Sequence, residues 1–274
     1  MTAPILAHLR GQNATLADTN AGRATSTSPR QSGRPDLRPA RKMPLMRKYN
    51  VLSMDEGGDL RTSFHMAPAD AFFEAAFSAF ARGTALDTAQ GPRAIEDLCP
   101  GDMIDTIEQG PQPVQWIGSM QIVPGAPISD PALARLTRIM AGSFGVHRPM
   151  TDVVAGPGAR ILQRPTHLRD LASAGPVFAP IRNAVDGMSV FEVTPPAPVT
   201  VYHLCLPQHA TIKASGLEFE SFHPGQGIER IMGQHMLTLF LSLFPHIDAP
   251  SDFGPLCRAR MATDDPGATR SHVA

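Results

Sequence analysis

The sequence predicts an all-β domain with one helix before the β core and one helix after it. The 27 Pro and 23 Gly residues, with only 18% charged residues, indicate many turns and short elements. From Thr84 onward, short β-prone runs alternate with turn signals at about the 8 to 12-residue spacing of sandwiches and barrels. Helical periodicity is found on either side of this stretch. The 42% hydrophobic share is enough for a sizeable core.

Turn dipeptides such as Pro100-Gly101 and Ser215-Gly216 separate the runs that we expect to be strands. One segment, 131–144, fits an amphipathic helix on periodicity alone. The expected strands are 85–88, 93–97, 103–108, 113–118, 136–140, 152–155, 159–163, 189–193, 200–206, 210–214 and 217–222.

Two segments have apolar residues at helical spacing. Between Met66 and Ala81, four phenylalanines and many alanines predict a short helix that ends near Phe80. Residues 228–243 predict a second helix, because their apolar side chains recur at i, i+3 and i+4 and the segment ends before Pro245. We expect this helix to dock on the β core of its own chain, with docking on another chain as the alternative.

Charge and composition divide the chain into four parts. Residues 1–49 contain nine Lys or Arg and two Asp or Glu, so the other residues carry 15 basic and 23 acidic side chains. A basic segment with few bulky apolar residues cannot bury enough surface to offset its ordering entropy. We therefore expect a disordered tail over 1–60, the β domain over 61–225, a helical extension over 226–256 and a disordered tail over 257–274.

Several functions find no support in the sequence. There is no apolar core of a secretory signal, which favours a soluble, cytoplasmic protein, and no apolar run approaches the ~20 residues of a membrane span. The basic tail lacks the aromatic residues of a base-stacking surface, so no specific nucleic acid is expected. No cofactor motif is present, and the three separate cysteines do not predict a zinc site. An unknown protein partner remains open, as does a start at Met43, Met46 or Met54.

Residues 82–106 (RGTALDTAQGPRAIEDLCPGDMIDT) resemble the opening of a Hint domain, the self-cleaving module of inteins and Hedgehog proteins. In that family a Cys, Ser or Thr nucleophile precedes the Phe of a C-F-x-x-G-T pattern. Here Phe80, Gly83 and Thr84 match, whereas Ala79 occupies the position of the nucleophile. The family reaction begins when that side chain attacks the preceding carbonyl, and a methyl group cannot do so.

Two later segments continue the resemblance. Residues 152–162, aligned on Pro157, place Gly156 at the position of a family hydroxyl and Ala159 at that of the activating His. Residues 201–216 (VYHLCLPQHATIKASG) resemble the third block and retain His209 in register. The resemblance implies a Hint-type β fold, with a strand in the second half of 131–144.

The same resemblance implies that the family reaction has been lost. The leading hypothesis is a Hint-fold binding or structural module without autocatalysis. The alternative is self-cleavage near residues 78–80, with Ser78 or an unrecognised nucleophile in the attacking role. A third hypothesis is a hydrolase-like site around His209.

Other polar residues have structural interpretations. His209 is the strongest retained candidate, although packing is favoured for it, and Thr84 is expected to fix the start of a strand. A metal site would require distant histidines to meet in the fold. These residues are His147, His167 and His203. Asp97, Asp102 and Asp105 are expected to form turns, and Trp116 is expected to lie in the core or at its rim.

Overall fold

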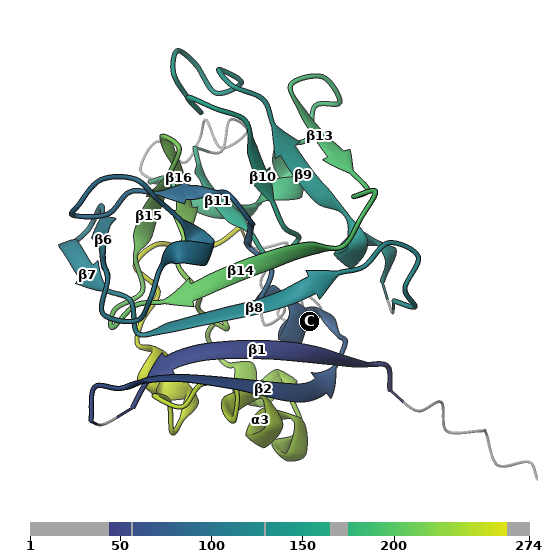
Figure 1. Cartoon of the computed structure of the whole chain (residues 1–274), viewed down its shortest axis with the longest axis vertical. Helices are drawn as coiled ribbons and strands as arrows, with labels where there is room; N and C mark the ends of the chain where they lie inside the picture. Colours follow the sequence, from purple (N-terminus) through teal and green to yellow (C-terminus); the bar gives the residue numbers. More distant parts are fainter. Residues whose placement is uncertain (1–43, 56, 129, 165–174, 262–274) are drawn as a thin grey trace, which may run out of the picture. The chain divides into compact units, whose positions relative to one another are not determined.

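The computed structural model describes residues 44–55, 57–128, 130–164 and 175–261, and these residues form two antiparallel β-sheets with a few short helices (Figure 1). The predicted all-β class is therefore confirmed. All of the elements belong to one unit, which spans residues 43–274. Within the described residues, three 3₁₀ helices connect strands, and a fourth follows helix α3 (Gln234–Leu241). The first three are η1 (Ile95–Asp97), η2 (Pro131–Ala134) and η3 (Ile181–Ala184), and the fourth is η4 (Pro250–Phe253).

The first sheet contains eight strands, and its centre holds the segment that matches the family nucleophile. Every neighbouring pair in this sheet is antiparallel. Its order is β13 (Val190–Val193), β9 (Leu136–Ile139), β10 (Val153–Ala155), β3 (Phe80–Ala81), β14 (Val199–Cys205), β8 (Trp116–Ile122), β1 (Met46–Met54) and β2 (Leu60–Pro68).

The second sheet contains the later strand of the third block, β15 (Thr211–Ala214), whereas the earlier strand, β14, belongs to the first sheet. Outside its main path, a further strand, β6 (Met103–Thr106), pairs with both β15 and β7 (Gly110–Pro113). Most of the predicted strands are found, including one in the second half of 131–144, whereas 93–97 is strand only at its start. The order is β12 (Val177–Pro180), β11 (Arg160–Gln163), β16 (Leu217–Glu220), β15 (Thr211–Ala214), β4 (Ala85–Leu86) and β5 (Arg93–Ala94).

The N-terminal boundary differs from the prediction that the disordered tail reaches residue 60. Residues 46–54 and 60–68 form the β1–β2 hairpin, which pairs in register from Met46 with Pro68 to Met54 with Leu60. Tyr49 and Val51 of β1 are buried on the side of the core. Their period-2 pattern lies within a basic stretch, so an average over composition concealed the strand. Residues 1–43 lie outside the described residues.

The first helix is also shorter than predicted. Helix α1 (Ala71–Ala75) begins at Asp70, whose carboxylate accepts hydrogen bonds from the amides of Phe72 and Phe73. It ends before Phe80 because the following backbone bonds to strands instead. The Ala79 amide donates to the Tyr202 carbonyl at 2.8 Å, and the Ala79 carbonyl accepts from the Gly156 amide at 2.9 Å.

The predicted C-terminal helix consists of two helices. Helix α2 (Ile228–Ile231) is followed by Met232 in an extended conformation, and α3 (Gln234–Leu241) begins after Gly233. As expected, the helices dock on their own β core: Phe240 and Phe244 pack in one cluster with residues of β1, β8 and β14. In Figure 1, α3 lies beside the β1–β2 hairpin.

Residues 257–261, which were expected to belong to a disordered tail, are part of the fold. The amide of Phe178 donates to the Ala259 carbonyl at 2.9 Å, and the amide of Met261 donates to the Phe178 carbonyl at 3.0 Å. Residues 257–261 therefore lie along β12, where their side chains reach the candidate site. Residues 262–274 lie outside the described residues.

Two hydrophobic clusters fill the core. The first joins the hairpin and the C-terminal helices around Trp116, whose indole N–H donates to the Leu243 carbonyl at 2.8 Å. The second surrounds Ala79, Phe80 and the strands of the second sheet. Of the two positions expected for Trp116, the core and its rim, the structure shows the core. None of the described helices has the length and apolar character required to span a membrane.

Candidate functional site

The position of the family nucleophile lies in the protein interior. Ala79 precedes β3, and its methyl group belongs to the second cluster, together with Ala155 and Ala159. Both backbone groups of Ala79 are hydrogen bonded, to Tyr202 and to Gly156. The peptide that an active relative would cleave is thus held firmly, next to a side chain that has no nucleophilic atom.

The turn between β10 and β11 lies directly against this peptide. The Gly158 amide donates to the Ser78 carbonyl at 2.9 Å, which is the carbonyl that the family nucleophile would attack. The structure therefore brings Gly156 and Ala159 to the segment that contains Ala79, as the alignment on Pro157 implied. Neither residue supplies a hydroxyl or an imidazole to the peptide.

Glycine is required at two positions of this turn by the close approach of the backbones. A Cβ built on Gly156 lies 2.1 Å from the Ser78 carbonyl oxygen, and one built on Gly158 lies 2.5 Å from the Ala75 carbonyl oxygen. Both distances are shorter than any normal carbon–oxygen contact. The turn can therefore pack this closely only because residues 156 and 158 have no side chain. A residue with a hydroxyl side chain at position 156 would require the backbone to move.

Retained His209 is held in a buried network. Its Nδ1 accepts a hydrogen bond from the Cys257 amide at 2.9 Å, so the ring hydrogen is on Nε2. Nε2 lies 3.0 Å from Oε1 of Glu220. Only 1% of the His209 side chain is exposed, and both ring nitrogens face protein groups. These contacts agree with the packing interpretation and leave no nitrogen free to activate water.

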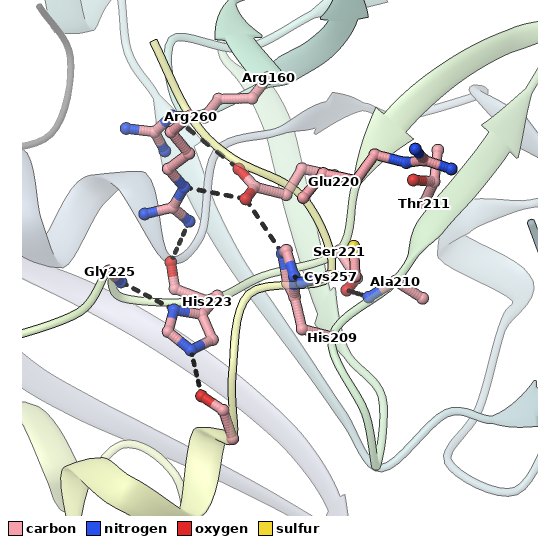
Figure 2. Close-up of polar contacts among 12 residues, drawn as sticks. Arg160, His209, Ala210, Thr211, Glu220, Ser221, His223, Gly225, Cys257 and Arg260 are labelled. Atoms are coloured by element: carbon pink, nitrogen blue, oxygen red, sulfur yellow. Dashed lines mark hydrogen bonds and ion pairs between the residues drawn. The ribbon is translucent and has the colours of Figure 1, made fainter. Parts of the chain in front are cut away.

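Two arginines hold the carboxylate of Glu220 (Figure 2). Arg260 Nε donates to Glu220 Oε1 at 2.8 Å, and its Nη2 donates to the His223 carbonyl at 2.7 Å. Arg160 Nε lies 3.9 Å from Glu220 Oε2 on the other side. Both side chains of the Arg260–Glu220 pair are only 3% exposed. Glu220 is therefore ionised in a site from which water is almost excluded.

Charges and burial shift the titration of these groups. Burial alone would raise the pKa of Glu220, but the Arg260 guanidinium and His209 outweigh it and lower this pKa to about 2. Burial lowers the pKa of His203 to about 3 and that of His223 to about 4. Burial raises the pKa of the Cys257 thiol to about 12. At neutral pH the site thus holds the Glu220 carboxylate, the neutral imidazoles of His203 and His223 and the protonated thiol of Cys257.

The free energy of unfolding is expected to decrease as the pH is lowered, because the imidazoles of His203 and His223 are neutral in the folded state. In the folded state His203 and His223 stay neutral down to about 3 and about 4, whereas the unfolded chain takes up these protons near 6.5. The unfolded state then binds more protons, so stability is lost as pH falls below about 6.5. Thermal melts followed by circular dichroism should show a decreasing melting temperature from about pH 7 to about pH 4.5, with a shallower decrease in His223→Gln. A wild-type melting temperature that stays constant over this range would contradict the assignment.

The other predicted candidates have structural contacts. The Ser78 side chain is fully buried, and its Oγ accepts from the Gly158 amide at 3.2 Å. The Thr84 hydroxyl donates to the Ala81 carbonyl at 2.8 Å, next to the start of β4, in agreement with the predicted role. Asp102 accepts from the Cys99 amide at 2.8 Å, as a turn-forming carboxylate should.

Two of the three histidines considered for a metal site, His147 and His203, lie within the described residues. His203 packs its ring against Phe80 and Phe222 in the core. His147 has a positive φ of 59° in a loop, and His167 lies outside the described residues. Over the described part of the chain, no three His, Cys, Asp or Glu side chains are arranged to bind a metal ion.

The sequence did not predict that Arg160 and Arg260 lie around the carboxylate of Glu220. Arg160 directly follows Ala159, and Arg260 lies 40 residues after its partner Glu220, in the segment expected to be disordered. No local pattern joins these positions, since the pairing depends on residues 257–261 folding back along β12.

The fold and this site define an all-β domain in which three segments far apart in sequence meet at one internal peptide. They are the segment before β3, the turn before β11 and strand β14, whose Tyr202 carbonyl accepts the hydrogen bond from the Ala79 amide. The sequence matches the Hint domain family model over residues 78–226. The chain therefore belongs to the Hint domain family, as the sequence resemblance indicated.

A comparison with solved structures found an intein-like domain. The chain is similar to the solution structure of the bacterial intein-like domain from Clostridium thermocellum, with 14% sequence identity and a TM-score of 0.34. The match covers 53% of this chain and 99% of that one. No curated protein matches the sequence.

Proposed function

We propose that this chain is a Hint domain that does not cleave itself and acts as a binding module. The observation that carries the proposal is the set of contacts around the Ser78–Ala79 peptide. A methyl group stands where the nucleophile is needed, and Gly156 and Ala159 supply neither a hydroxyl nor an imidazole. The buried position of the peptide and its hydrogen bonds to Tyr202 and Gly156 support a structural role for it.

The alternative of residual self-cleavage would require Ser78 to attack the carbonyl of Phe77. The Ser78 hydroxyl is fully buried and accepts a hydrogen bond from the Gly158 amide. A serine needs an adjacent base to become nucleophilic, and the position of the family His holds Ala159. The thiol of Cys257 is also an unsuitable nucleophile, since burial raises its pKa to about 12. These features support the inactive hypothesis.

A hydrolase-like site around His209 has less support. A general base must reach the proton that it removes. His209 instead has its Nδ1 bonded to the Cys257 amide and its Nε2 facing Glu220, with almost no exposed surface. We interpret His209 as the residue that joins the β15–β16 hairpin to the C-terminal segment.

Restoring the nucleophile alone is the experiment that tests this proposal. We expect Ala79→Cys to remain uncleaved after prolonged incubation with a thiol, because no imidazole is available at 159 to protonate the departing nitrogen. Intact mass spectrometry measures the outcome, with Ala81→Cys as the matched control for non-specific thiol reactions. The double variant Ala79→Cys/Ala159→His restores both the nucleophile and the imidazole, so comparison with the single variant shows the effect of the missing imidazole. Cleavage of the single variant beside residue 79 would contradict the proposal, because the remaining site would then be catalytically competent.

A further inference from the structure

A pocket of about 220 Å³ lies beside the lost reaction site. The turn before β11, helices α1 and α3 and the end of β16 contribute to its lining. The volume is below the ~300–1,000 Å³ of pockets for drug-sized ligands, so only a small molecule fits. Ala159, at the position of the family His, forms part of its wall.

His203 lines this pocket and has a hydrogen-bond donor without an acceptor. The residue is only 3% exposed, and its Nδ1 accepts a hydrogen bond from the Leu204 amide at 3.1 Å. The ring is neutral at pH 7, because burial lowers its pKa to about 3, and its one ring hydrogen must then be on Nε2. Within the described residues, this Nε2–H has no acceptor. Because buried donors are nearly always satisfied, the N–H indicates a place for an acceptor that the chain itself does not supply.

Arg260 adds further donors to the lining of the pocket. Figure 2 shows its guanidinium beside the Glu220 carboxylate and the His223 carbonyl, which accept from Nε and Nη2. A guanidinium has five N–H donors, and within the described residues Nη1 has no acceptor. Besides burial, the charge of Arg260 lowers the pKa of His203, so the two side chains lie near each other. Two buried side chains of the lining therefore have donors to offer to a ligand.

The arginines of the lining already have partners within the protein. Arg260 forms an ion pair with Glu220 in which both side chains are only 3% exposed. Arg160 and Arg182 have interactions of their own. A charged ligand would lose its hydration here and would have to compete for a counter-charge that is already in use. A neutral carbonyl oxygen accepts hydrogen bonds at a much smaller cost of desolvation.

The rest of the pocket offers apolar surface. Phe72 of α1, Leu133 of η2 and Phe240 of α3 contribute to it. An aliphatic or aromatic group placed against these side chains is removed from water, which favours binding. The ligand that fits both parts of the lining has an acceptor at one end and an apolar group at the other.

We propose that the pocket binds a small neutral molecule that carries a carbonyl oxygen beside a short apolar group. The oxygen accepts from Nε2–H of His203 and from Nη1 of Arg260, and the apolar group packs against Phe72, Leu133 and Phe240. This inference rests on the proposed binding role and specifies the ligand class for it. Small aromatic and aliphatic amides have this combination of groups.

NMR titration of the isotope-labelled full-length chain tests the proposal. The probes are benzamide and butyramide as neutral carbonyl ligands, benzoate and benzylammonium as charged ligands, and N-acetylphenylalanine methylamide as a mimic of a peptide. We expect benzamide to bind and to shift the signal of the His203 Nε2–H, because this N–H gains an acceptor. Benzoate and benzylammonium should bind more weakly than benzamide, since each must bring a charge out of water.

Removal of the imidazole donor alone gives a sharper test. His203→Phe keeps a ring that can pack against Phe80 and Phe222, but this ring has no N–H. We expect the affinity for benzamide to fall about fivefold or more, because one buried hydrogen bond is lost. His246→Phe is the matched control, because His246 also packs edge-on against a phenylalanine ring, that of Phe244, and lies outside the pocket lining.

A second variant serves if His203→Phe does not fold. Ala75 is partly exposed at the end of α1 and lines the pocket, so the phenyl group of Ala75→Phe should fill the pocket and abolish benzamide binding. Unchanged affinity in either variant overturns the inference. So does a His203 Nε2–H signal that does not respond, or failure of both amides to bind. Tighter binding of benzoate, benzylammonium or the peptide mimic than of benzamide overturns it as well.

These outcomes are distinguishable from failure of the proposed function, because intact mass measures self-cleavage separately. A chain that binds benzamide but cleaves itself contradicts only the loss of autocatalysis. A chain that stays intact but binds neither benzamide nor butyramide contradicts only this inference.

Discussion

Gly156→Ser is expected to destabilise the domain severely, although serine is the kind of residue that the family has at this position. The added Cβ would lie 2.1 Å from the Ser78 carbonyl oxygen, so the turn before β11 must move away from the segment before β3. That movement also breaks the hydrogen bond from the Gly156 amide to the Ala79 carbonyl. We expect a loss of about 3 kcal/mol or more, which is a decrease of about 6–12 °C in melting temperature for a domain of this size.

A matched glycine provides the control for this prediction. Gly233 precedes α3 with a φ of −64°, and a Cβ built there meets nothing within 4 Å. Gly233→Ser should leave the melting temperature unchanged or raise it slightly, because serine is a favourable residue at a helix N-terminus. Equal melting temperatures for Gly156→Ser and wild type would show that the turn can accept a side chain, and the explanation for Gly156 would be wrong.

Arg260→Met is expected to have the second large effect. Methionine fills much of the space of the arginine but carries no charge. The remaining partners of the Glu220 carboxylate are then His209 and Arg160, whose Nε lies 3.9 Å from Glu220 Oε2. Removing one partner of a buried ion pair typically costs about 3–5 kcal/mol, because the remaining charge is left without compensation. The His223 carbonyl also loses its donor at 2.7 Å. Chemical denaturation monitored by tryptophan fluorescence measures the loss, since Trp116 is the single tryptophan.

Two further variants show whether the buried charge is the cause. Arg258→Met removes a more exposed arginine from Glu108, and we expect a cost of only about 0–1 kcal/mol. In Arg260→Met/Glu220→Gln the charge is removed together with its partner, so a large part of the stability should return. If Arg260→Met and Arg258→Met are equally stable, the account of the Glu220 network is incorrect.

The sequence was a good guide to the β core and a poor guide to the segments at its two ends. Turn dipeptides and apolar runs located most strands, because these signals are local. The β1–β2 hairpin was missed because its alternating pattern lies in a basic stretch, and residues 257–261 because their role depends on contacts with β12. The break between α2 and α3 at Gly233 interrupts a periodicity that continues in the sequence.

For the candidate site too, some residues could be predicted from the sequence and others could not. The losses at Ala79, Gly156 and Ala159 were visible as departures from a family pattern. The structure adds the reason why Gly156 fits, which is the contact with the Ser78 carbonyl oxygen. The arginines around Glu220 could not be found from sequence, since charged residues 40 and 60 positions apart have no local signature. Their pairing depends on how the two sheets and the C-terminal segment pack together.

Intact mass of the purified full-length chain, incubated with and without a thiol, tests the central claim most directly. A Hint domain without a nucleophile at Ala79 should give a single species of 29.3 kDa in both samples. Two fragments from a break beside residues 78–80, present or increased in the thiol sample, would contradict the claim. They would show that this domain still processes itself through a nucleophile other than the one that the family alignment locates.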